Sequence, residues 1–334
     1  MPDVFQTDSR PLQGPLFAAV SRSFCLSLRF LPPPVRGPLS VSYLLARAAD
    51  TIADVEARPA AQRLALLGQF RASLADTGKG ADGAFFAAAA AFAAAVDHAG
   101  ERELLERLTE GFGQLGNLTP GSQEKVRAVL ELILDGMTLD LQRFPDAAVL
   151  RSLATGAELD QYTWLVAGCV GEFWTAICAA ELPGVFTRSE AEMEALGRNF
   201  GKGLQLINIL RDQAGDAVLG RCYLPEDSLR AAGLSGAVVW PAEDWAPWQA
   251  VRRELTGRAR AFLADGWTYA ASQRSIRLRF AALMPLLIGG GTLAQLEKLP
   301  PDGPPAAVKV TRPEVKRLAR RALWMAVTGR ITPS

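Results

Sequence analysis

Two pairs of aspartates, each with three residues between its members, stand inside apolar segments of this 334-residue chain. The first pair is Asp50 and Asp54, and the second is Asp212 and Asp216. Residues four apart on an α-helix lie on one face, one turn apart. Like charges at this spacing destabilise a helix by about 0.2–0.5 kcal/mol, so something positive must balance them. Because Mg²⁺ binds carboxylates and substrate phosphates, the pattern predicts a diphosphate held through metal between two facing helices.

Each aspartate pair continues a stripe of polar residues with helical spacing. The stripes consist of Tyr43, Arg47, Asp50 and Asp54, and of Gln205, Asn208, Asp212 and Asp216. Arg211 and Arg221 flank the second stripe, so each segment carries both acids for metal and bases for phosphate. Most positions between them are apolar, which indicates buried helices, and unpaired acids buried there would be costly. For one pair alone, the alternative is a solvated face on which Arg47 or Arg211 pairs with the neighbouring acid. Two matched pairs favour a metal site.

Composition predicts an all-α fold. Apolar residues make up 49% of the chain, which is enough for a sizeable core. Alanine and leucine dominate, and there is no long alternating strand pattern or glycine-rich phosphate loop. The chain has 36 basic and 35 acidic residues, so its overall charge does not favour binding to nucleic acid.

Cysteine and histidine usage excludes several kinds of site. The single histidine, His98, rules out a histidine-based zinc site and a Ser-His-Asp triad. Four widely spaced cysteines without a C-x-x-C motif are expected to be free thiols. They are Cys25, Cys169, Cys178 and Cys222.

No signal peptide or transmembrane segment is expected, and the predicted location is the cytoplasm, peripheral to a membrane at most. The most apolar stretch, residues 280–296, is expected to be a buried helix that kinks or breaks at Pro285 and at the three glycines from Gly289. Pro32–Pro34 should separate two helices, and residues 119–122 should form a turn before a helix at 131–143. Ser189 and Glu192 form a predicted capping box.

Three blocks of the chain resemble, in order, those of the squalene and phytoene synthases, which join prenyl diphosphates head to head. The first block is SRSFCLSLRFLPPPVRGPLSVSYLLARAADTIADVE, from Ser21. The second is QYTWLVAGCVGEFW, from Gln161, and the third is NFGKGLQLINILRDQAGDAVLGRCYLP, from Asn199. The resemblance implies the fold of the isoprenoid synthases, a single-domain bundle of α-helices around a central cavity, over residues 1–334. It also implies a Mg²⁺-dependent prenyltransferase that condenses two farnesyl diphosphates through a cyclopropyl intermediate.

The resemblance also implies a role for individual residues. Asp50, Asp54, Asp212 and Asp216 would bind two or three Mg²⁺ ions. Ser21, Arg22, Arg47, Arg211 and Arg221 would contact diphosphate, whereas Tyr43, Gln205 and Asn208 would line the cavity. Phe24 would lie near a prenyl chain, with core packing as its alternative. Tyr43 is the favoured candidate for the catalytic tyrosine. Tyr162 is the second, although the family's tyrosine can stand three positions later, where this chain has Leu165.

Small residues in the three blocks have two interpretations. They would either let prenyl chains lie close to the backbone or let helices pack tightly, and the second is favoured for most of them. The set includes Ala46, Ala49, Ala167, Gly168, Gly171, Gly201 and Gly203.

The product depends on whether a reductant takes part. Squalene synthases reduce the rearranged cation with NADPH, whereas phytoene and dehydrosqualene synthases lose a proton. Residues 308–312 resemble the segment of squalene synthases near NADPH, so Lys309 and Arg312 are candidate cofactor contacts, with a solvated basic surface as the alternative. Squalene synthase is the favoured prediction, with farnesyl diphosphate as substrate and transient membrane contact for product release. Phytoene or dehydrosqualene synthase is the alternative.

Other functional classes fit the motifs less well. A class I terpene cyclase normally has one aspartate-rich motif and an N-S-E-type motif. A chain-elongating prenyltransferase would show D-D-x-x-D, which is absent. A non-catalytic assembly factor that binds prenyl diphosphate would be expected to lose some of the acids, and all four are present.

Overall fold

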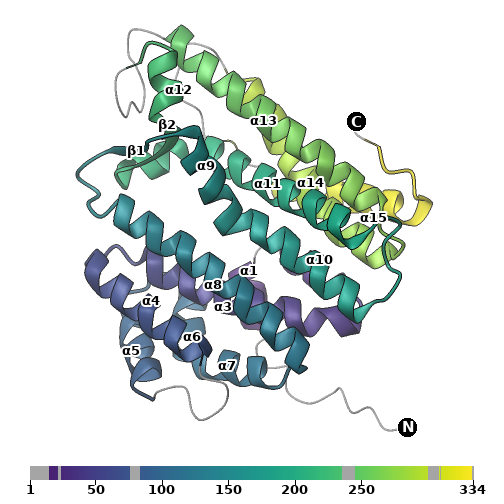
Figure 1. The fold of residues 1–334 in the computed structure, drawn as a ribbon, viewed down its shortest axis with the longest axis horizontal. Helices are drawn as coiled ribbons and strands as arrows, with labels where there is room; N and C mark the ends of the chain where they lie inside the picture. The colour runs from purple at the N-terminus through teal and green to yellow at the C-terminus, as the bar shows by residue number, and fades with distance from the viewer. Residues whose placement is uncertain are drawn as a thin grey trace. The chain divides into compact units, whose positions relative to one another are not determined.

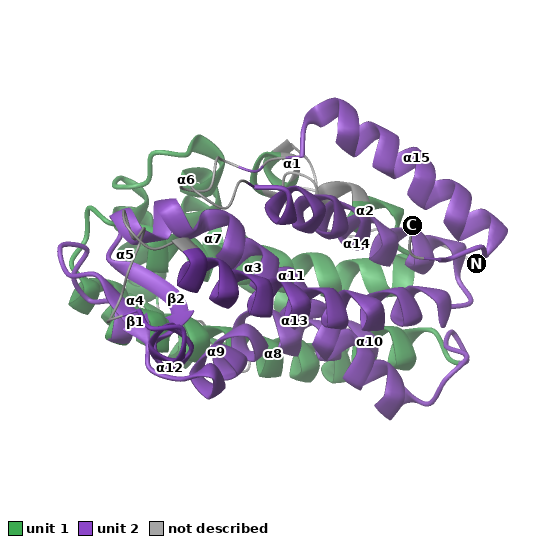
Figure 2. Cartoon of the chain, turned by 90° about the horizontal axis from the view of Figure 1, so that it is seen from above, with its two compact units in different colours: residues 1–142, 176–183 green, residues 143–175, 184–334 purple. Residues whose placement is uncertain are grey.

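The computed structural model describes residues 15–21, 24–75, 83–234, 245–299, 308 and 310–332. These residues are almost entirely helical, with two short strands, which confirms the prediction of an all-α fold (Figure 1). The chain divides into two compact units (Figure 2). Unit 1 comprises Met1–Gln142 and Ala176–Pro183, and unit 2 comprises Arg143–Thr175 and Gly184–Ser334.

Unit 1 is built from the N-terminal helices, and aromatic rings fill part of its interior. The ring of Phe70 meets the rings of Phe85 and Phe112 edge-on, with centroids 5.7 and 5.2 Å apart. Such edge-to-face pairs are favoured over face-to-face stacking. The helices are α1 (Pro15–Ser21), α2 (Phe24–Phe30), α3 (Pro33–Asp54), α4 (Ala60–Ala75), α5 (Gly83–Ala93), α6 (Ala99–Glu106), α7 (Leu108–Gly116) and α8 (Pro120–Arg143).

Unit 2 is organised around the long helix α11 (Glu190–Val218), which packs against α13 (Trp245–Ala271) and α14 (Ile276–Glu297). Two short parallel strands, β1 (Arg151–Leu153) and β2 (Arg221–Pro225), pair with each other. The sequence did not predict these strands, because neither is long enough to show an alternating pattern. The remaining elements are α9 (Gly156–Thr163), the π-helix η1 (Trp164–Gly168), α12 (Glu226–Ala231) and α15 (Arg312–Thr328). Helix α10 (Cys169–Glu181) belongs to unit 2 up to Thr175 and to unit 1 from Ala176.

Small residues let α11 approach its neighbours at backbone contact. A methyl group on Gly171 would lie 2.0 Å from the carbonyl oxygen of Gly197, and one on Gly201 would lie 2.2 Å from that of Ala167. A methyl group on Gly203 would lie 2.8 Å from Cβ of Phe262. Real side chains do not make contacts this short, so Gly171, Gly201 and Gly203 serve tight helix packing, the interpretation that the sequence favoured.

Several local predictions are confirmed. Ser189 and Glu192 form the capping box that starts α11. Between α2 and α3 the helical structure is interrupted at Pro32, and the next two prolines begin α3. Cys169, Cys178 and Cys222 are free and buried.

Two local predictions are wrong. The turn expected at residues 119–122 is the start of α8, which begins at Pro120 rather than near residue 131. Helix α14 is largely buried, as predicted, but it does not break at Pro285 or at the three glycines. Its burial explains this continuity, because packing of a core helix outweighs the propensity cost of single residues. A kink there stays a prediction.

Two helical stretches are long and apolar enough to cross a membrane, by length and composition only. They are Gly156–Glu181 and Ile276–Glu297, and 44% and 61% of their most apolar windows are buried inside the protein. Core helices of globular proteins share this pattern, so it is weak evidence for a membrane span. The expected absence of a transmembrane segment stays a prediction.

Candidate functional site

The first aspartate pair lies on α3 in unit 1, a helix that starts with proline at its first positions. Its apolar side is buried and includes Leu44, Leu45, Ala48, Ala49 and Ile52. The opposite side carries the predicted stripe and reaches solvent. Asp54 is exposed, and the side chain of Asp50 keeps 39% of its exposure. The predicted stripe therefore lies on the side of α3 opposite its buried face.

Arg47 connects the stripe to a neighbouring helix. Its guanidinium donates hydrogen bonds to Asp50 on α3 and to Glu101 on α6. The side chain of Glu101 is only 16% exposed, so this ion pair is shielded from water more than a surface pair would be. The Nε of Arg47 is buried and has no hydrogen-bond partner among the described residues. Arg47 therefore pairs with an acid, as the alternative interpretation expected. Its Nε–H remains as a donor for a hydrogen bond to a phosphate oxygen.

The surroundings of Asp50 disfavour its ionised form, although part of its side chain reaches solvent. Burial raises the pKa of its carboxyl group from an ordinary 3.8 to about 7, with help from the negative charge of Asp54 and despite the opposing effect of Arg47. Glu101 adds to the rise. A divalent cation at Asp50 and Asp54 would reverse this effect by supplying a nearby positive charge.

Tyr43 is fixed one turn before Arg47. Its hydroxyl donates a hydrogen bond of 3.1 Å to the carbonyl oxygen of Val20 on α1, and its ring centroid lies 5.7 Å from that of Phe17. The C-terminal part of α1 is thus close to the stripe. Ser21 ends α1 and Phe24 begins α2, whereas Arg22 lies outside the described residues.

The second aspartate pair lies on α11 in unit 2, near the C-terminal end of that helix. Arg211 holds Asp212 through two hydrogen bonds, of which the one from Nε is 2.7 Å long. This contact raises the pKa of Arg211. One turn earlier, the amide of Asn208 donates to Oε1 of Gln205 over 3.3 Å. The carboxylate of Asp212 stays 47% exposed, so it remains accessible to a metal ion.

A tight turn after α11 brings Arg221 back beside Asp216. Gly220 makes this turn with a φ of +71°, and a methyl group there would lie 2.7 Å from the carbonyl oxygen of Asp146. Strand β2 follows and pairs with β1. Asp216, Arg221 and Gln213 line a small cavity of about 20 Å³, which is enough for one water molecule. The G-R-x-Y-x-P ending is therefore a structural device that returns an arginine to the aspartate pair.

Tyr162 stacks on a tyrosine of this returning strand. The rings of Tyr162 and Tyr223 are 4.7 Å apart and inclined by 19°. Leu165, the alternative position for a tyrosine, is buried within the π-helix η1. π-helical turns are rare and often mark functional sites. Tyr162 is thus placed beside the second aspartate block, whereas Leu165 belongs to the core.

The described residues contain no group of three or more His, Cys, Asp or Glu side chains that could hold a metal ion by themselves. Mg²⁺ does not require one, because it commonly uses one or two carboxylates and completes its shell with water and substrate phosphates. The donor sets at Asp50 with Asp54, and at Asp212 with Asp216, fit this mode of binding. Of the predicted cofactor contacts, Arg312 is exposed at the start of α15, and Lys309 lies outside the described residues.

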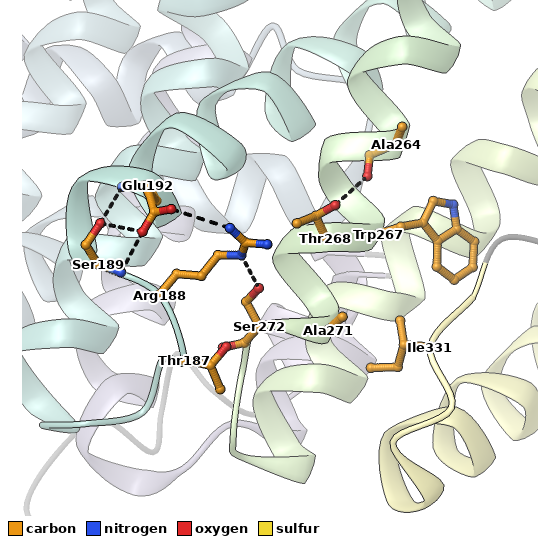
Figure 3. Close-up of a pocket in the computed structure, with 10 residues that line it drawn as sticks. All are labelled: Thr187, Arg188, Ser189, Glu192, Ala264, Trp267, Thr268, Ala271, Ser272 and Ile331. Atoms are coloured by element: carbon orange, nitrogen blue, oxygen red, sulfur yellow. Dashed lines mark hydrogen bonds and ion pairs between the residues drawn. The ribbon is translucent and has the colours of Figure 1, made fainter.

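An open groove of about 740 Å³ lies at the other end of α11, around Arg188 and Trp267 (Figure 3). Arg188 donates to Ser272 over 3.1 Å and pairs with Glu192 over 3.4 Å. Since α11 rises 1.5 Å per residue, this groove is roughly 35 Å from Asp212 along the helix. Although it is much larger than the cavity at Asp216, it shares none of the motif residues.

Sequence reasoning missed several polar contacts near the motifs. Glu101 joins the first pair through Arg47, and Lys202 on α11 pairs with Asp160 on α9. Gln213 lines the cavity beside Asp216. Gln213 had a detectable signal, because it stands within the second pair. Glu101 and Asp160 had none, because each meets its partner only through packing of distant segments.

Comparison with known proteins places these motifs in one family. The sequence profile of the family described as squalene/phytoene synthase matches residues 17–314. The chain is 28% identical over 336 residues to the presqualene diphosphate synthase of Zymomonas mobilis, an alignment that covers 99% of this chain and 97% of that protein. It is 28% identical to phytoene synthase 2 of Solanum lycopersicum over 54% of this chain and 65% of that one. A solved ligand complex of TcSQS superposes with a TM-score of 0.73 at 25% identity, covering 94% of this chain and 87% of that one.

Proposed function

We propose that this chain, which belongs to the squalene/phytoene synthase family, joins two farnesyl diphosphates head to head and releases the cyclopropyl diphosphate as its product. The observation that carries the proposal is the similarity to a presqualene diphosphate synthase along 99% of the chain. The match to a phytoene synthase covers only 54% of it. Two helices with paired acids and arginines supply the groups that such a reaction needs.

The proposed reaction balances without a reductant. The C1–O bond of the first farnesyl diphosphate breaks, and the diphosphate leaves with the electron pair. The C2–C3 double bond of the second substrate attacks the C1 cation. Loss of a proton from that C1 closes the cyclopropane ring. The products are one cyclopropylcarbinyl diphosphate, one inorganic diphosphate and one proton.

Arginines beside the two aspartate pairs would bind the diphosphate groups. Arg47, Arg211 and Arg221 each lie next to a motif aspartate, and guanidinium groups match phosphate geometry well. Mg²⁺, held by Asp50 with Asp54 and by Asp212 with Asp216, would neutralise the diphosphate charge and favour its departure. Arg47 and Arg211 would then exchange part of their contact with Asp50 and Asp212 for phosphate oxygens.

Tyr43 is the proposed positioning group near the reacting carbons. Its hydrogen bond to Val20 and its contact with Phe17 fix the ring on the same helical stripe as Arg47. An aromatic face can stabilise an allylic cation. The hydroxyl, which donates its proton to the carbonyl oxygen of Val20, would hold the ring in place for that role. Tyr43→Phe would keep the first of these effects and remove the second.

Reduction to squalene by NADPH is a second candidate, supported by the resemblance of residues 308–312 to squalene synthases and by the structural similarity to TcSQS. Arg312 is exposed at the first turn of α15 and accessible to a cofactor phosphate. This candidate predicts a hydrocarbon that forms only when NADPH is present.

Product identification separates the two candidates. Purified protein would be incubated with farnesyl diphosphate and Mg²⁺, with and without NADPH, and the products would be identified by mass spectrometry before and after phosphatase treatment. The proposal predicts a C30 cyclopropylcarbinyl diphosphate in both conditions. Squalene that appears only with NADPH would replace the proposal with its reductive alternative. Asp54→Asn should abolish the product, whereas Asp97→Asn, at an exposed aspartate of the same unit, should leave it unchanged.

A further inference from the structure

We propose that the outward face of α15 binds the surface of an anionic lipid bilayer. This face, called the α15 outer face below, consists of Lys316, Arg317, Arg320, Leu323, Trp324 and Val327. The inference does not depend on the proposed reaction.

Helix α15 divides cleanly into an inner and an outer side. Its inner side packs on the core of unit 2 through Val315, Leu318, Ala319, Ala322, Met325 and Ala326. These positions follow the spacing of an amphipathic helix. The α15 outer face occupies the opposite side, and Figure 2 draws this helix at the edge of unit 2.

The C-terminal half of the outer face is apolar, although it faces solvent. Leu323, Trp324 and Val327 are 43, 54 and 58% exposed. Single exposed apolar residues are normal, but three on one face of a helix form a patch. Arg279 on α14 donates to the carbonyl oxygen of Ala326 over 3.4 Å, which places the start of α14 beside this end of α15. Ile276, in the first turn of α14, is also 46% exposed.

The N-terminal half of the outer face is basic. Lys316, Arg317 and Arg320 are all exposed, and the side chain of Arg317 keeps 78% of its exposure. From Arg312 to Arg330 the chain has six bases and one acid, whereas its total charge is only +1. The single acid, Glu314, is used to cap α15 through Thr311. The positive charge is therefore concentrated on this helix.

An anionic bilayer matches both halves of this face. Helices that lie in a membrane interface insert tryptophan and aliphatic residues among the headgroups, and lysines and arginines attract anionic lipids. Tryptophan is the residue type that interfaces favour, because its ring is apolar and its N–H can still meet water. A folded protein partner would have to supply acids and an apolar pocket in register, whereas a bilayer supplies both without a specific shape.

Co-sedimentation with lipid vesicles tests the proposal without any substrate. The full chain would be mixed with vesicles of phosphatidylcholine that contain about 30 mol% phosphatidylglycerol, an anionic lipid of the kind that attracts basic helices. Vesicles of phosphatidylcholine alone are the uncharged control. Binding is expected only to the anionic vesicles and should fall in high salt, which screens exposed charges. Charge reversal at Lys316, Arg317 and Arg320 should weaken it by about a hundredfold or more, since each base contributes roughly fivefold.

A matched control removes the effect of net charge. Reversal of three exposed bases elsewhere in unit 2, Arg253, Arg274 and Lys298, changes the total charge equally and should leave most of the binding intact. If the two triple variants lose binding to the same extent, the α15 outer face is not the binding surface. Thermal unfolding of both variants shows that each is folded.

The fluorescence of Trp324 reports its depth directly. Vesicles with brominated acyl chains should quench the wild-type signal more than that of Trp324→Phe, whereas Trp267→Phe, in the groove of Figure 3, should be quenched like the wild type. Absence of a difference would overturn the proposal. A second result would also overturn it. If substitution of Leu323, Trp324 and Val327 by serine changes the oligomeric state but leaves vesicle binding intact, the face binds a second copy of the chain.

Discussion

The guanidinium of Arg47 donates a hydrogen bond to the carboxylate of Asp50, three residues further along α3. This contact does not offset the effects of burial and of Asp54, because the pKa of Asp50 is still raised to about 7. A carboxyl group that resists ionisation in the unliganded protein is suited to a cation that arrives with the substrate. Stability is therefore expected to depend on both pH and Mg²⁺.

Asp50→Asn should stabilise the metal-free protein at pH 8. Because the folded-state pKa lies above the ordinary 3.8, the folded state binds more protons than the unfolded state between these values. Stability contributed by Asp50 is therefore lost as the pH rises from about 4 to about 8. With a discount for its 39% exposure, the gain is on the order of 1 kcal/mol, or about 1–2 °C in Tm.

Thermal unfolding with and without Mg²⁺ checks this prediction. Mg²⁺ should raise the Tm of the wild type at pH 8 and have a smaller effect on Asp50→Asn. Asp97→Asn serves as the control for loss of one negative charge. A lower Tm for metal-free Asp50→Asn would mean that the contact with Arg47 outweighs the repulsion from Asp54.

Glu101→Gln should make Asp50 easier to ionise. The negative charge of Glu101 raises the pKa of Asp50, so its removal lowers that pKa, and Arg47 becomes free to pair with Asp50 alone. Mg²⁺ affinity would be measured by calorimetry across pH. The midpoint pH at which affinity is lost on acidification is expected to be lower than in the wild type by a fraction of a pH unit. Glu103→Gln, on the same helix but paired with Arg107, should leave the midpoint in place. An unchanged midpoint in Glu101→Gln would remove Glu101 from the site.

Gly171→Ala should unfold or strongly destabilise the protein. Its methyl group would lie 2.0 Å from the carbonyl oxygen of Gly197, and backbone cannot move aside as a flexible side chain can. We expect a loss of at least about 3 kcal/mol in denaturant titration. Gly257→Ala on α13 meets nothing within 4 Å and should gain about 1 kcal/mol from helix propensity. Similar stabilities for the two variants would show that α10 and α11 have room between them.

Sequence reasoning was most successful where the information is local. Helical spacing placed Tyr43, Arg47, Asp50 and Asp54 on one face, and the capping box at Ser189 follows from residues three apart. It failed where packing decides. Glu101 is 54 residues from Arg47 along the chain, and nothing in either segment marks the other.

Continuity of α14 through Pro285 was missed for a related reason. Local propensity predicts a break there, but the helix is buried along most of its length, and its packing outweighs the cost of the proline and glycines. The return of Arg221 to Asp216 depends on the left-handed turn at Gly220 and on the pairing of β2 with β1, neither of which a helical pattern can indicate.

The two aspartate pairs should act on the same reaction. Asp50→Asn and Asp212→Asn are each expected to lower kcat/KM by about 10²–10³-fold, because each removes part of the charge that stabilises the departing diphosphate. If both pairs serve that step, the double variant should lose less than the product of the single losses. If the fold-losses in kcat/KM of the two single variants multiply fully in the double variant, the two pairs act in separate steps.

The decisive measurement is the amount of inorganic diphosphate released for each farnesyl diphosphate consumed. Condensation that ends at the cyclopropyl diphosphate releases one inorganic diphosphate for every two substrates, because the second diphosphate stays on the product. The proposal predicts this ratio of one to two, unchanged by NADPH. A ratio of one to one would contradict it, since that value requires either a hydrocarbon product or simple hydrolysis of the substrate.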